Sequence, residues 1–513
     1  MVVVKRALLS CTEKAGLEEL ARALAELRVE LVASSGTAEF LRQRGLTVRT
    51  VEEFAGITEQ LDGRVKTLHP KIHAGILARR DDPAHLRAVG EAGLIDLVAV
   101  TLYPFQQTAG RRGVSLPEAV EQIDIGGVAL LRAAAKNFTH VAAVCQPQQY
   151  PAVIEALRRG KGQLPEDLTR QLATAAFHLT SAYDTAISSY LAVEDGPGRF
   201  PEEAGVRVRK RQLLRYGENP HQRGAWYVSA SGAAWGLGAL TQLQGKALSY
   251  NNLLDLDASL RCLLDFEEPA CVIIKHHSPC GLASAAAPLE VYRRALACDP
   301  ESAFGGVVGC NRPIDAALAG QLTSTFLEVV LAPSVEPKAL AVFGKKPTLR
   351  VVTLDWPSRI PPGPEWRSLL GSWLLQDPDT LTLEAGALQV VTQRIPTERE
   401  RADLLFAWRA VKHVKSNGIV LARDAATVGI GQGQPSRVGS VRLAIQQAGA
   451  RSRQAVAASD GFFPFPDSVE LLAKAGVTAV IQPGGSIRDA EVAAAADAAK
   501  LAMLVTGVRH FRH

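Results

Sequence analysis

The sequence predicts an α/β protein with a parallel sheet covered by helices and with more than one domain. Strand-like and helix-like segments alternate over residues 1–190, and the strand-like segments are apolar throughout, which is typical of strands covered on both faces. The chain of 513 residues is also longer than a single hydrophobic core usually supports. Sheets of this kind bind ligands beyond the carboxyl ends of their strands, so we expect site residues in those loops.

The elements of the first part follow from the spacing of apolar side chains. Residues 2–10, 29–33, 95–101 and 141–145 are nearly continuous apolar runs, and we expect each to form a buried strand. Residues 16–26 repeat Leu and Ala at helical spacing, which predicts a helix with one buried face. Alternation of this kind predicts helices on the faces of a parallel sheet.

The domain boundary is expected where periodicity is lost. A long helical pattern over 164–193 gives way to Gly, Pro and acidic residues. We therefore expect a first domain at 1–195 with its compact core at about 1–146, a linker at 196–205 and a second domain at 206–513.

The second domain is long enough for two subdomains. The Pro-rich stretch 356–365 is the best candidate for a break between them. The Ala-rich stretch 490–503 is expected to form an amphipathic helix.

Composition excludes several classes of protein. Hydrophobic residues make up 47% and charged residues 21%, which excludes intrinsic disorder, and the 43 Gly and 28 Pro have no collagen-like period. The net charge of +5 does not make nucleic acid the default partner but suits a small anionic substrate. Seven cysteines without a Cys-x-x-Cys pair favour reduced thiols. The N-terminus lacks a signal-peptide pattern and no apolar run reaches the ~18 residues of a membrane span, so we expect a cytoplasmic protein.

Patterns that suggest metal or dinucleotide binding are incomplete. His69 and His73 are spaced i, i+4, but no Glu follows the first His as in a zincin. Cys280 follows a proline but lacks the second Cys of the zinc deaminases. The glycines of 429–434 lack the third Gly of a dinucleotide fingerprint. We therefore predict neither a catalytic metal nor NAD.

Two loops that follow strand-like segments are suited to anions. Residues 34–37 (SSGT) lie between a strand and a helix, where backbone N–H groups and the helix dipole attract phosphate, although helix capping explains them equally well. Arg64, Lys66 and Lys71 make a second, basic loop, which alone is best interpreted as solvated. Two such loops together favour a phosphorylated ligand.

Groups suited to proton transfer follow in both halves. Tyr103, Asp124 and Lys136 fall near predicted sheet ends, although Asp124 as a cap and Tyr103 as a core aromatic are the simpler interpretations. Lys275 and His276 follow an apolar strand and form a natural acid/base pair, because a cation lowers the pKa of a neighbouring His. A buried, hydrogen-bonded histidine is the competing interpretation.

Three later segments are less specific. Residues 462–467 (FFPFPD) are aromatic and rigid, and they suit either the wall of a heterocycle site or core packing. Residues 483–489 have the small-residue pattern of an anion or carboxylate site. The basic end at 509–513 is of a kind that is usually frayed.

Together these segments closely resemble the bifunctional purine biosynthesis enzymes that join IMP cyclohydrolase to AICAR transformylase. The resemblance covers essentially the whole chain and rests on matches that occur in the same order, at 64–77, 102–105, 123–127, 214–222, 246–258, 273–281, 302–306, 415–420, 431–444, 460–469 and the basic C-terminus.

The resemblance implies a fold, a cosubstrate and an assembly. Its N-terminal part would be a methylglyoxal-synthase-like parallel-sheet domain with cyclohydrolase activity. Its C-terminal part would be a transformylase of two cytidine-deaminase-like subdomains without zinc. The family uses 10-formyltetrahydrofolate as a cosubstrate with no tightly bound cofactor, and it forms homodimers with transformylase sites at the interface. No nucleic acid or membrane partner is implied.

The implied transformylase step is attack of the AICAR 5-amino group on the formyl carbon of 10-formyltetrahydrofolate. It requires removal of an amine proton and stabilisation of an oxyanion. By position, His276 matches the family's proton acceptor and Lys275 its transition-state stabiliser, with His221 as an assisting group. The residues matched to AICAR binding are Arg215, Tyr216, Gly305, Glu328, Asn417, Arg437 and Arg509, and those matched to folate binding are Val438, Phe463, Asp467, Gly484 and Gly485.

The formylated product, FAICAR, closes to IMP when its carboxamide nitrogen attacks the formyl group and water leaves. By resemblance, Lys136 is the catalytic lysine, with Lys66, Tyr103 and Asp124 around the ring. The residues matched to FAICAR and IMP binding are Thr12, Lys14, Ser34, Ser35, Gly36, Thr37, Arg64, Val65, Thr67, Thr101, Leu102 and Ile125.

Three positions depart from the family's usual residues: Ser278 and Thr101 stand where Asn is common, and Ser35 where Gly is frequent. One alternative is therefore the same fold with only one of the two activities. Another is a nucleotide-binding regulatory protein without catalysis, against which the Lys275–His276 pair argues, because binding alone needs no proton-transfer groups.

Overall fold

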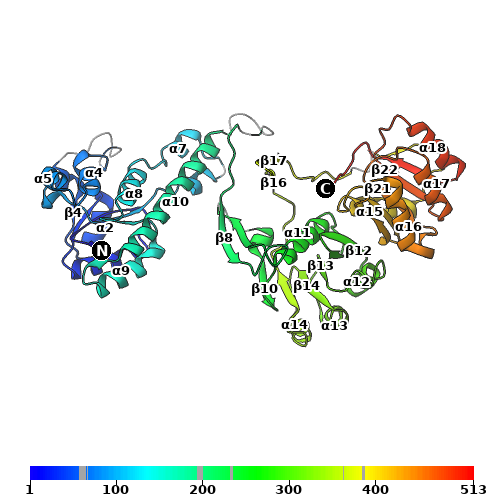
Figure 1. Ribbon diagram of the computed structural model, residues 1–513, viewed down its shortest axis with the longest axis horizontal. Helices are drawn as coiled ribbons and strands as arrows, with labels where there is room; N and C mark the ends of the chain where they lie inside the picture. The colour runs from blue at the N-terminus through cyan, green and yellow to red at the C-terminus, as the bar shows by residue number, and fades with distance from the viewer. Residues whose placement is uncertain are drawn as a thin grey trace. The chain divides into compact units, whose positions relative to one another are not determined.

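The chain divides into two compact units, Met1–Ala204 and Gly205–His513, each of which is described by itself (Figure 1). The structure is a computed structural model that describes residues 1–56, 65, 67–111, 113–192, 200, 202–230, 235–361, 363–383 and 388–513. The division between the units falls at the end of the predicted linker, whose residues 196–199 and 201 lie outside the described residues.

The first unit is built on a five-stranded sheet in the order β4-β3-β2-β5-β6, and every neighbouring pair is parallel. Its strands are β2 (Arg6–Cys11), β3 (Glu30–Ala33), β4 (Arg49–Thr50), β5 (Leu97–Thr101) and β6 (Ala142–Val144). Its helices are α1 (Leu17–Glu26), α2 (Ser35–Arg42), α3 (Val51–Ala55), α4 (Pro70–Leu77), α5 (Pro83–Val89), α6 (Phe105–Ala109), α7 (Leu116–Val120), α8 (Gly126–Lys136), α9 (Tyr150–Arg159) and α10 (Glu166–Leu191). The predicted α/β fold with a parallel sheet is confirmed.

Helices cover both faces of this sheet, which explains why its strands are apolar throughout. Alternate side chains of a strand point to opposite faces. In β2, Ala7 and Leu9 pack with α1, α2 and α9, whereas Leu8 packs with α3, α4, α8 and α10. Every residue of β5 is buried. The loops after these strands therefore meet at one edge of a rigid, fully covered sheet.

The single strand predicted at 2–10 is wrong. Residues Val2–Val3 form β1, which pairs antiparallel with β7 (Gln163–Leu164), and β2 begins only at Arg6. The buried carboxylate of Asp96 accepts hydrogen bonds from the backbone N–H groups of Lys5 and Arg6 at 2.9 and 3.0 Å. The N–H groups of Lys5 and Arg6 therefore bond a side chain between the two strands and do not continue the antiparallel ladder of β1.

The second unit contains a twelve-stranded sheet whose two halves repeat one order of elements, a helix, a hairpin and then three helix–strand pairs. The first half comprises α11 (Tyr250–Leu264), β11 (Ala270–Lys275), β12 (Ser278–Ser284), α12 (Pro288–Leu296), β13 (Gly306–Cys310), α13 (Ala316–Leu322), β14 (Leu327–Ala332), α14 (Pro337–Phe343) and β15 (Arg350–Thr353). The second half comprises α15 (Glu398–Val411), β19 (Ile419–Arg423), β20 (Ala426–Gly431), α16 (Arg437–Ala448), β21 (Val456–Ser459), α17 (Asp467–Lys474), β22 (Ala479–Gln482), α18 (Asp489–Ala498) and β23 (Ala502–Val505).

The two halves join where β12 meets β20. Ala283 pairs with Ala426, and the Thr427 hydroxyl accepts a hydrogen bond from the Leu282 N–H at 2.9 Å. The sheet order runs outward from this seam in the same sense on both sides, as β12-β11-β13-β14-β15 and β20-β19-β21-β22-β23. The Pro-rich stretch follows β15, between the halves.

Among the described residues of the second unit, six further strands lie outside the repeat. They are β8 (Val208–Leu213), β9 (Ala225–Ser229), β10 (Thr241–Gln244), β16 (Glu365–Leu369) and β17 (Ser372–Gln376), which form a hairpin, and β18 (Gln389–Val390). The helix predicted over 490–503 is too long. It ends at Ala498, because the residues that follow form β23 (Ala502–Val505), which lies between β22 and β18.

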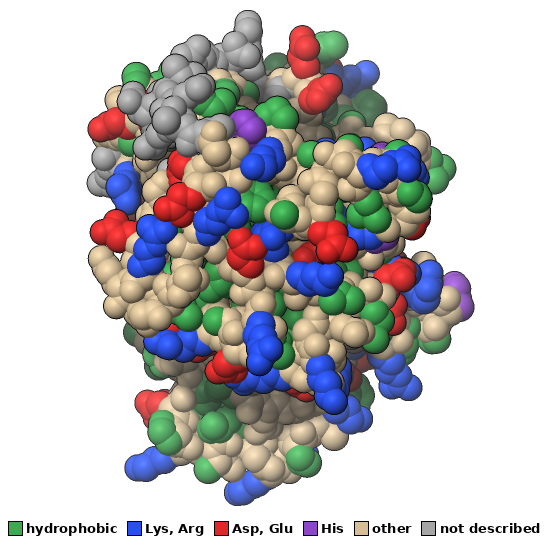
Figure 2. Space-filling model, turned by 90° about the vertical axis from the view of Figure 1, so that its left-hand side faces the viewer, with side chains coloured by type: hydrophobic (Ala, Val, Ile, Leu, Met, Phe, Trp, Pro, Cys, Tyr) green, Lys and Arg blue, Asp and Glu red, His purple; other side chains and the backbone are tan. Residues whose placement is uncertain are grey.

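Among the described residues, no helix is long and apolar enough to cross a membrane. On the face that Figure 2 shows, Lys and Arg side chains are interspersed with Asp and Glu. This mixing agrees with a small net charge and not with a single large field of one sign.

Asn311 is expected to be essential for the stability of the second unit. Its buried amide accepts from the Ala270 N–H at 2.8 Å and donates to the carbonyls of Phe266 and Glu268 at 2.9 and 2.8 Å. Asn311→Ala leaves three buried backbone groups unpaired, so the free energy of unfolding should fall by about 3 kcal/mol.

Urea unfolding followed by tryptophan fluorescence measures this effect, because all six tryptophans lie in the second unit. Asn251→Ala, at an exposed position of α11, is the matched control and should change stability by about 0.5 kcal/mol or less. A loss below about 1 kcal/mol for Asn311→Ala would contradict the assignment.

Candidate functional site

In the first unit, threonine hydroxyls meet at the carboxyl edge of the sheet. β2 and β5 are adjacent and parallel, so the residues that end them lie side by side. The Thr12 hydroxyl is 3.0 Å from the Thr101 carbonyl oxygen and 2.9 Å from that of Leu102. The Thr101 hydroxyl accepts from the Glu13 N–H at 2.9 Å. Thr101 therefore takes part in the hydrogen bonds of this edge, although enzymes of the resembling family commonly have Asn at this position.

A second group of polar side chains gathers around Thr37 at the start of α2. The buried Thr37 hydroxyl accepts from the Cys11 N–H at 3.1 Å and from the Lys14 ammonium at 3.0 Å. Lys14 also donates to the Cys11 carbonyl, and burial lowers the pKa of its amine. Ser34 is the N-cap residue of α2, and its hydroxyl lies 3.3 Å from that of Thr37. A cation beside a helix N-terminus is suited to a phosphate.

Asp124 lies at the N-terminal end of α8 beside Tyr103. Its carboxylate accepts from the Gly127 N–H at 2.7 Å and from the Tyr103 N–H at 3.4 Å. Burial raises the pKa of the Asp124 carboxyl, and these two hydrogen bonds oppose that rise. A Cβ on Gly126 would lie 2.3 Å from the Thr67 hydroxyl oxygen, so Thr67 approaches as closely as a glycine permits.

The structure does not bring Lys136 to this group. Lys136 is exposed at the C-terminal end of α8, ten residues beyond Gly126 and therefore about 15 Å away along the helix axis. The adjacent Asn137 bonds the carbonyls of Ile76 and Ala78, away from Asp124. Within one chain, Lys136 and Asp124 thus lie at opposite ends of α8, and the role expected for Lys136 stays a prediction.

The remaining residues of the expected nucleotide site vary in placement. Arg64 and Lys66 lie outside the described residues. The Val65 carbonyl accepts from the Leu68 N–H at 3.0 Å. Ile125 is 61% exposed beside Asp124, at the same end of α8.

In the second unit, β11 ends at Lys275, and His276 and His277 form the tight turn that leads into β12. The register pairs Lys275 with Ser278, so only the two histidines lie in the turn. Both have positive φ, 52° and 64°. Two consecutive residues in this region are characteristic of a type I′ hairpin turn, which favours Asn and Gly over larger residues. The sequence predicted a strand end here but contains no Asn-Gly signal for the hairpin.

The ammonium of Lys275 is fixed by backbone carbonyls. It donates to Phe304 at 2.9 Å and to Gly305 at 3.0 Å. Gly305 has φ +68°, and a Cβ there would lie 3.1 Å from the Lys275 nitrogen. Glycine is therefore required both by its backbone conformation and by the approach of Lys275.

Glu328, on the neighbouring strand β14, is bound by Arg350 at 2.5 Å. Arg215 and His221 are exposed in the loop between β8 and β9, and the Arg215 guanidinium lies 5.5 Å from the centre of the Tyr216 ring. This loop contacts α11, because Asn251 donates to the Glu218 carbonyl at 3.4 Å.

The C-terminal tail connects the histidine turn to a pocket in the second half. The Arg512 guanidinium donates to His277 Nε2 at 3.2 Å, and its carbonyl accepts from the Ser416 N–H at 2.9 Å. Burial, and then the charge of Arg512, lower the pKa of His277. Arg509 lies over the Phe511 ring at 4.5 Å. The tail is held by these contacts, and the expectation that it frays is wrong.

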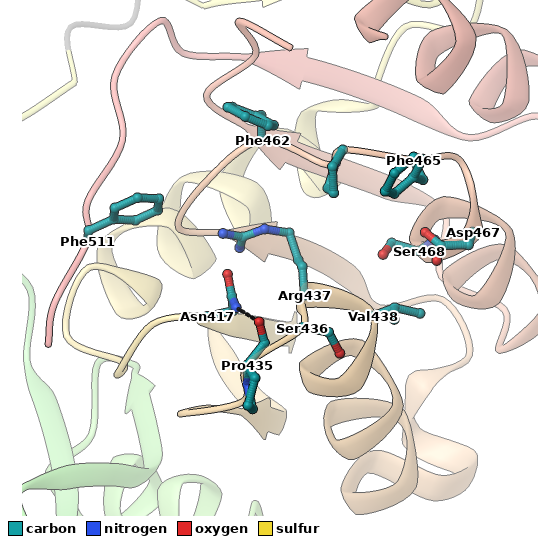
Figure 3. A pocket seen from close by; sticks show the side chains of 11 residues that line it. Asn417, Pro435, Ser436, Arg437, Val438, Phe462, Phe465, Asp467, Ser468 and Phe511 are labelled. Atoms are coloured by element: carbon teal, nitrogen blue, oxygen red, sulfur yellow. Dashed lines mark hydrogen bonds between the residues drawn. The ribbon is translucent and has the colours of Figure 1, made fainter. Parts of the chain in front are cut away.

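Phe511 lines a pocket of about 410 Å³ at the ends of β20 and β21. In Figure 3, Phe462 and Phe465 lie across the pocket from Pro435 and Ser436, and the Arg437 side chain extends between them. The other lining residues include Asn417, Val438, Asp467 and Ser468.

Buried polar groups fix the position of Arg437. Its guanidinium bonds the fully buried Asp460 and donates to the Ser459 hydroxyl at 2.8 Å. The Asn417 side-chain amide donates to the Gln434 carbonyl at 2.8 Å, and the backbone carbonyl of Asn417 accepts from the Ser440 hydroxyl at 2.7 Å. Arg437 and Asn417 therefore lie in one preorganised corner of the pocket.

Phe463, which the resemblance matches to folate binding, does not line this pocket. Its side chain is fully buried in the core of the second half, and its N–H donates to Gln482 Oε1 at 2.8 Å. The preceding Phe462 lines the pocket instead and is 39% exposed; it belongs to the aromatic segment 462–467 but was not among the residues matched to folate. Successive side chains of an extended segment point to opposite sides, so a Phe-Phe pair next to a buried strand already indicates that only one ring faces the pocket.

Gly484 and Gly485 line a different cavity, of about 490 Å³, at the ends of β22 and β23. Arg488 lies between the two regions, with its guanidinium 4.9 Å from the centre of the Phe465 ring. The structure therefore brings Val438 and Asp467 together in one pocket and places the glycine pair in another. Among the described residues, no group of three or more His, Cys, Asp or Glu side chains could hold a metal ion.

Two family models match the chain, and one of them crosses the division between the two units. A family model described as "AICARFT/IMPCHase bienzyme" matches residues 134–447, and one described as "MGS-like domain" matches residues 16–129. The bifunctional purine biosynthesis protein PurH of Roseobacter denitrificans is 48% identical over 527 residues, with 99% of each chain covered. The protein of that name from Desulfitobacterium hafniense is 49% identical over 520 residues, with 99% of this chain and 100% of the relative covered.

A solved structure titled "Crystal structure of ForH" is 35% identical and covers 37% of this chain and 98% of its own, at a TM-score of 0.33 that is too low to bear on the fold. The family model, in contrast, spans more than half of the residues, and the relatives match the chain from end to end. The chain belongs to the AICARFT/IMPCHase bienzyme family.

Proposed function

We propose that the chain catalyses two consecutive reactions, formyl transfer from 10-formyltetrahydrofolate to AICAR and ring closure of the product FAICAR to IMP. The observation that carries this proposal is the His276–His277 turn of the second unit. The proposed base, His276, directly follows Lys275, whose ammonium is held by two backbone carbonyls. The hydroxyl-rich sheet edge of the first unit supports a separate site for a phosphorylated ring.

In the formyl-transfer step, His276 accepts a proton from the 5-amino group of AICAR as the nitrogen attacks the formyl carbon. Its imidazole is exposed on the turn and can reach a bound substrate. The Lys275 ammonium stabilises the oxyanion of the tetrahedral intermediate. Because backbone carbonyls already hold this ammonium, little reorganisation is needed when the charge develops. When the intermediate collapses, the bond between the formyl carbon and folate N10 breaks, and the His276 imidazolium gives its proton to N10, so that tetrahydrofolate leaves.

The folate ring is assigned to the pocket of Figure 3. A volume of about 410 Å³ lies within the usual range for small-molecule sites. Phe462 and Phe465 offer apolar surfaces to a planar ring, and Asp467 supplies a hydrogen-bond acceptor at its edge. We propose 10-formyltetrahydrofolate as a dissociable cosubstrate and no tightly bound cofactor.

In the ring-closure step, the nucleotide phosphate is assigned to the start of α2 beside Lys14, and the reacting ring to the space beside Tyr103 and Asp124. The raised pKa of the buried Asp124 carboxyl makes its carboxylate a stronger base than an exposed aspartate. Asp124 then accepts a proton from the carboxamide nitrogen as that nitrogen attacks the formyl carbon, and the formyl oxygen takes up a proton to become a hydroxyl group. The carbon–oxygen bond then breaks as a further N–H proton is lost, so that the hydroxyl group leaves as water.

We further propose a cytoplasmic homodimer with transformylase sites at the interface. Leu370, Trp373 and Leu374 are exposed on the β16–β17 hairpin, and burial against a second copy would remove this apolar surface from water. All seven cysteines are free and buried, which suits a reducing compartment. Light scattering should give the mass of two chains, and a monomer at working concentration would contradict the shared sites.

His276→Ala should lower kcat for formyl transfer by about 100-fold or more, because the base that accepts the amine proton is lost. Purified protein is incubated with AICAR and 10-formyltetrahydrofolate, and the nucleotides are separated by chromatography. The unaltered chain should yield IMP. The internal control is ring closure of FAICAR supplied directly, which the variant should retain. Formyl transfer within about threefold of the unaltered chain would remove His276 from the mechanism.

Asp124→Asn should lower kcat for ring closure by about 100-fold, because an amide cannot accept the proton. Formyl transfer on the same chain should be unchanged, so FAICAR should accumulate. Lys136→Ala, measured alongside, tests the role carried over by resemblance. Unchanged ring closure would remove Lys136 from the mechanism, whereas a comparable loss would require that a second chain bring Lys136 to the ring. Undiminished ring closure by Asp124→Asn would refute the base assignment.

A further inference from the structure

The two halves of the second unit contain the same unusual turn. In the first half, His276 and His277 have φ of 52° and 64°, and in the second half Asp424 and Ala425 have φ of 56° and 51°. Each pair forms the two-residue connection of the hairpin that follows the first helix of its half. Residues other than glycine are disfavoured in this region, so each turn needs support from its surroundings.

That support comes from an aspartate on the preceding helix in both halves. On α15, the Asp403 carboxylate accepts from the Asp424 and Ala425 N–H groups at 2.9 and 2.7 Å. On α11, Asp255 Oδ1 accepts from the His277 N–H at 2.6 Å. Hydrogen bonds to a carboxylate are stronger than those between neutral groups. The same device therefore holds the same turn twice.

The two turns differ in what they carry. The Asp424–Ala425 turn offers no imidazole or amine, whereas the His276–His277 turn carries the proposed base and follows the proposed oxyanion-stabilising Lys275. Asp403 therefore serves the fold alone, and it is a built-in control for any additional role of Asp255.

Asp255 is also surrounded by the charges of the turn. Burial raises the pKa of its carboxyl, while the bond from His277 and the charges of His276 and Lys275 lower it. Arg512 bonds the other side of the turn at His277 Nε2. The backbone of His277 is thus held by Asp255, and its side chain by Arg512.

We propose that Asp255 is a positioning residue for formyl transfer, whose carboxylate oxygen holds the His276–His277 turn so that the His276 imidazole meets the AICAR amine beside the Lys275 ammonium. This proposal rests on the roles given above to His276 and Lys275. The contact is to the backbone of His277, so Asp255 acts through the turn and not on the substrate.

The test compares Asp255→Ala with Asp255→Asn and Asp403→Ala in the full chain. Asp255→Ala should lower kcat for formyl transfer by about 100-fold, the cost of misplacing a catalytic group by about 1 Å, with KM for AICAR changed less than about threefold. Asp255→Asn keeps an oxygen that can accept from His277, so its kcat should stay within about fivefold of the unaltered chain. Ring closure of FAICAR should be unchanged in both.

Asp403→Ala is the matched control. It should lower the unfolding midpoint of the second unit, followed by tryptophan fluorescence, and leave kcat at 25 °C within about threefold. The proposal is overturned if Asp255→Ala lowers kcat no more than Asp403→Ala does, if it raises KM alone, or if Asp255→Asn loses as much activity as Asp255→Ala.

Two further measurements keep the result decisive. Should Asp255→Ala not fold, Asp255→Glu displaces the carboxylate by one methylene and should lower kcat at least tenfold, and a kcat within about threefold would overturn the proposal. His276→Ala is measured in parallel. If it leaves formyl transfer intact, the proposed role of the histidine has failed. If it abolishes transfer while Asp255→Ala does not, only the positioning role has failed.

Discussion

The proposed formyl-transfer site depends on a backbone constraint, because two adjacent residues must both adopt positive φ at the tip of a hairpin near the centre of a twelve-stranded sheet. The ladder between β11 and β12 pairs Lys275 with Ser278, so that only His276 and His277 connect the two strands. Gly305 admits the Lys275 amine, and the C-terminal tail reaches the same place through Arg512. The proposed base His276 and the proposed oxyanion-stabilising Lys275 are therefore positioned by the sheet, and not by a loop that must close.

In the first unit, polar side chains are positioned in a different way. Its parallel strands end together at one edge, so the side chains that follow them converge without a strained turn. Thr12 and Thr101 cross-bond there, and Thr37 links the start of α2 to Lys14. The edge is preorganised by neutral hydroxyls, with one partly buried amine beside a helix N-terminus. Such an edge is suited to a phosphate, and Asp124, the base proposed for ring closure, lies at the start of α8.

Much of this organisation could be predicted from the sequence, because apolar runs report burial on both faces and ordered motifs report the family. What could not be predicted is the direction in which particular side chains point from the backbone. The choice between Phe462 and Phe463 is a matter of which side of the chain faces the pocket. The distance between Asp124 and Lys136 depends on the length of α8, because Lys136 is the last residue of that helix. Asp255 was missed because an aspartate inside a helical pattern gives no sign that it bonds a turn twenty-two residues later.

The histidine turn also has a consequence for laboratory evolution. At both of its positions, glycine or asparagine would fit the left-handed backbone better than histidine does. A library of variants selected only for heat resistance would therefore be enriched in exchanges that remove the imidazole of His276, since those exchanges relieve the backbone. Selection for robustness and selection for turnover act in opposite directions on this turn, so a screen must apply both at once.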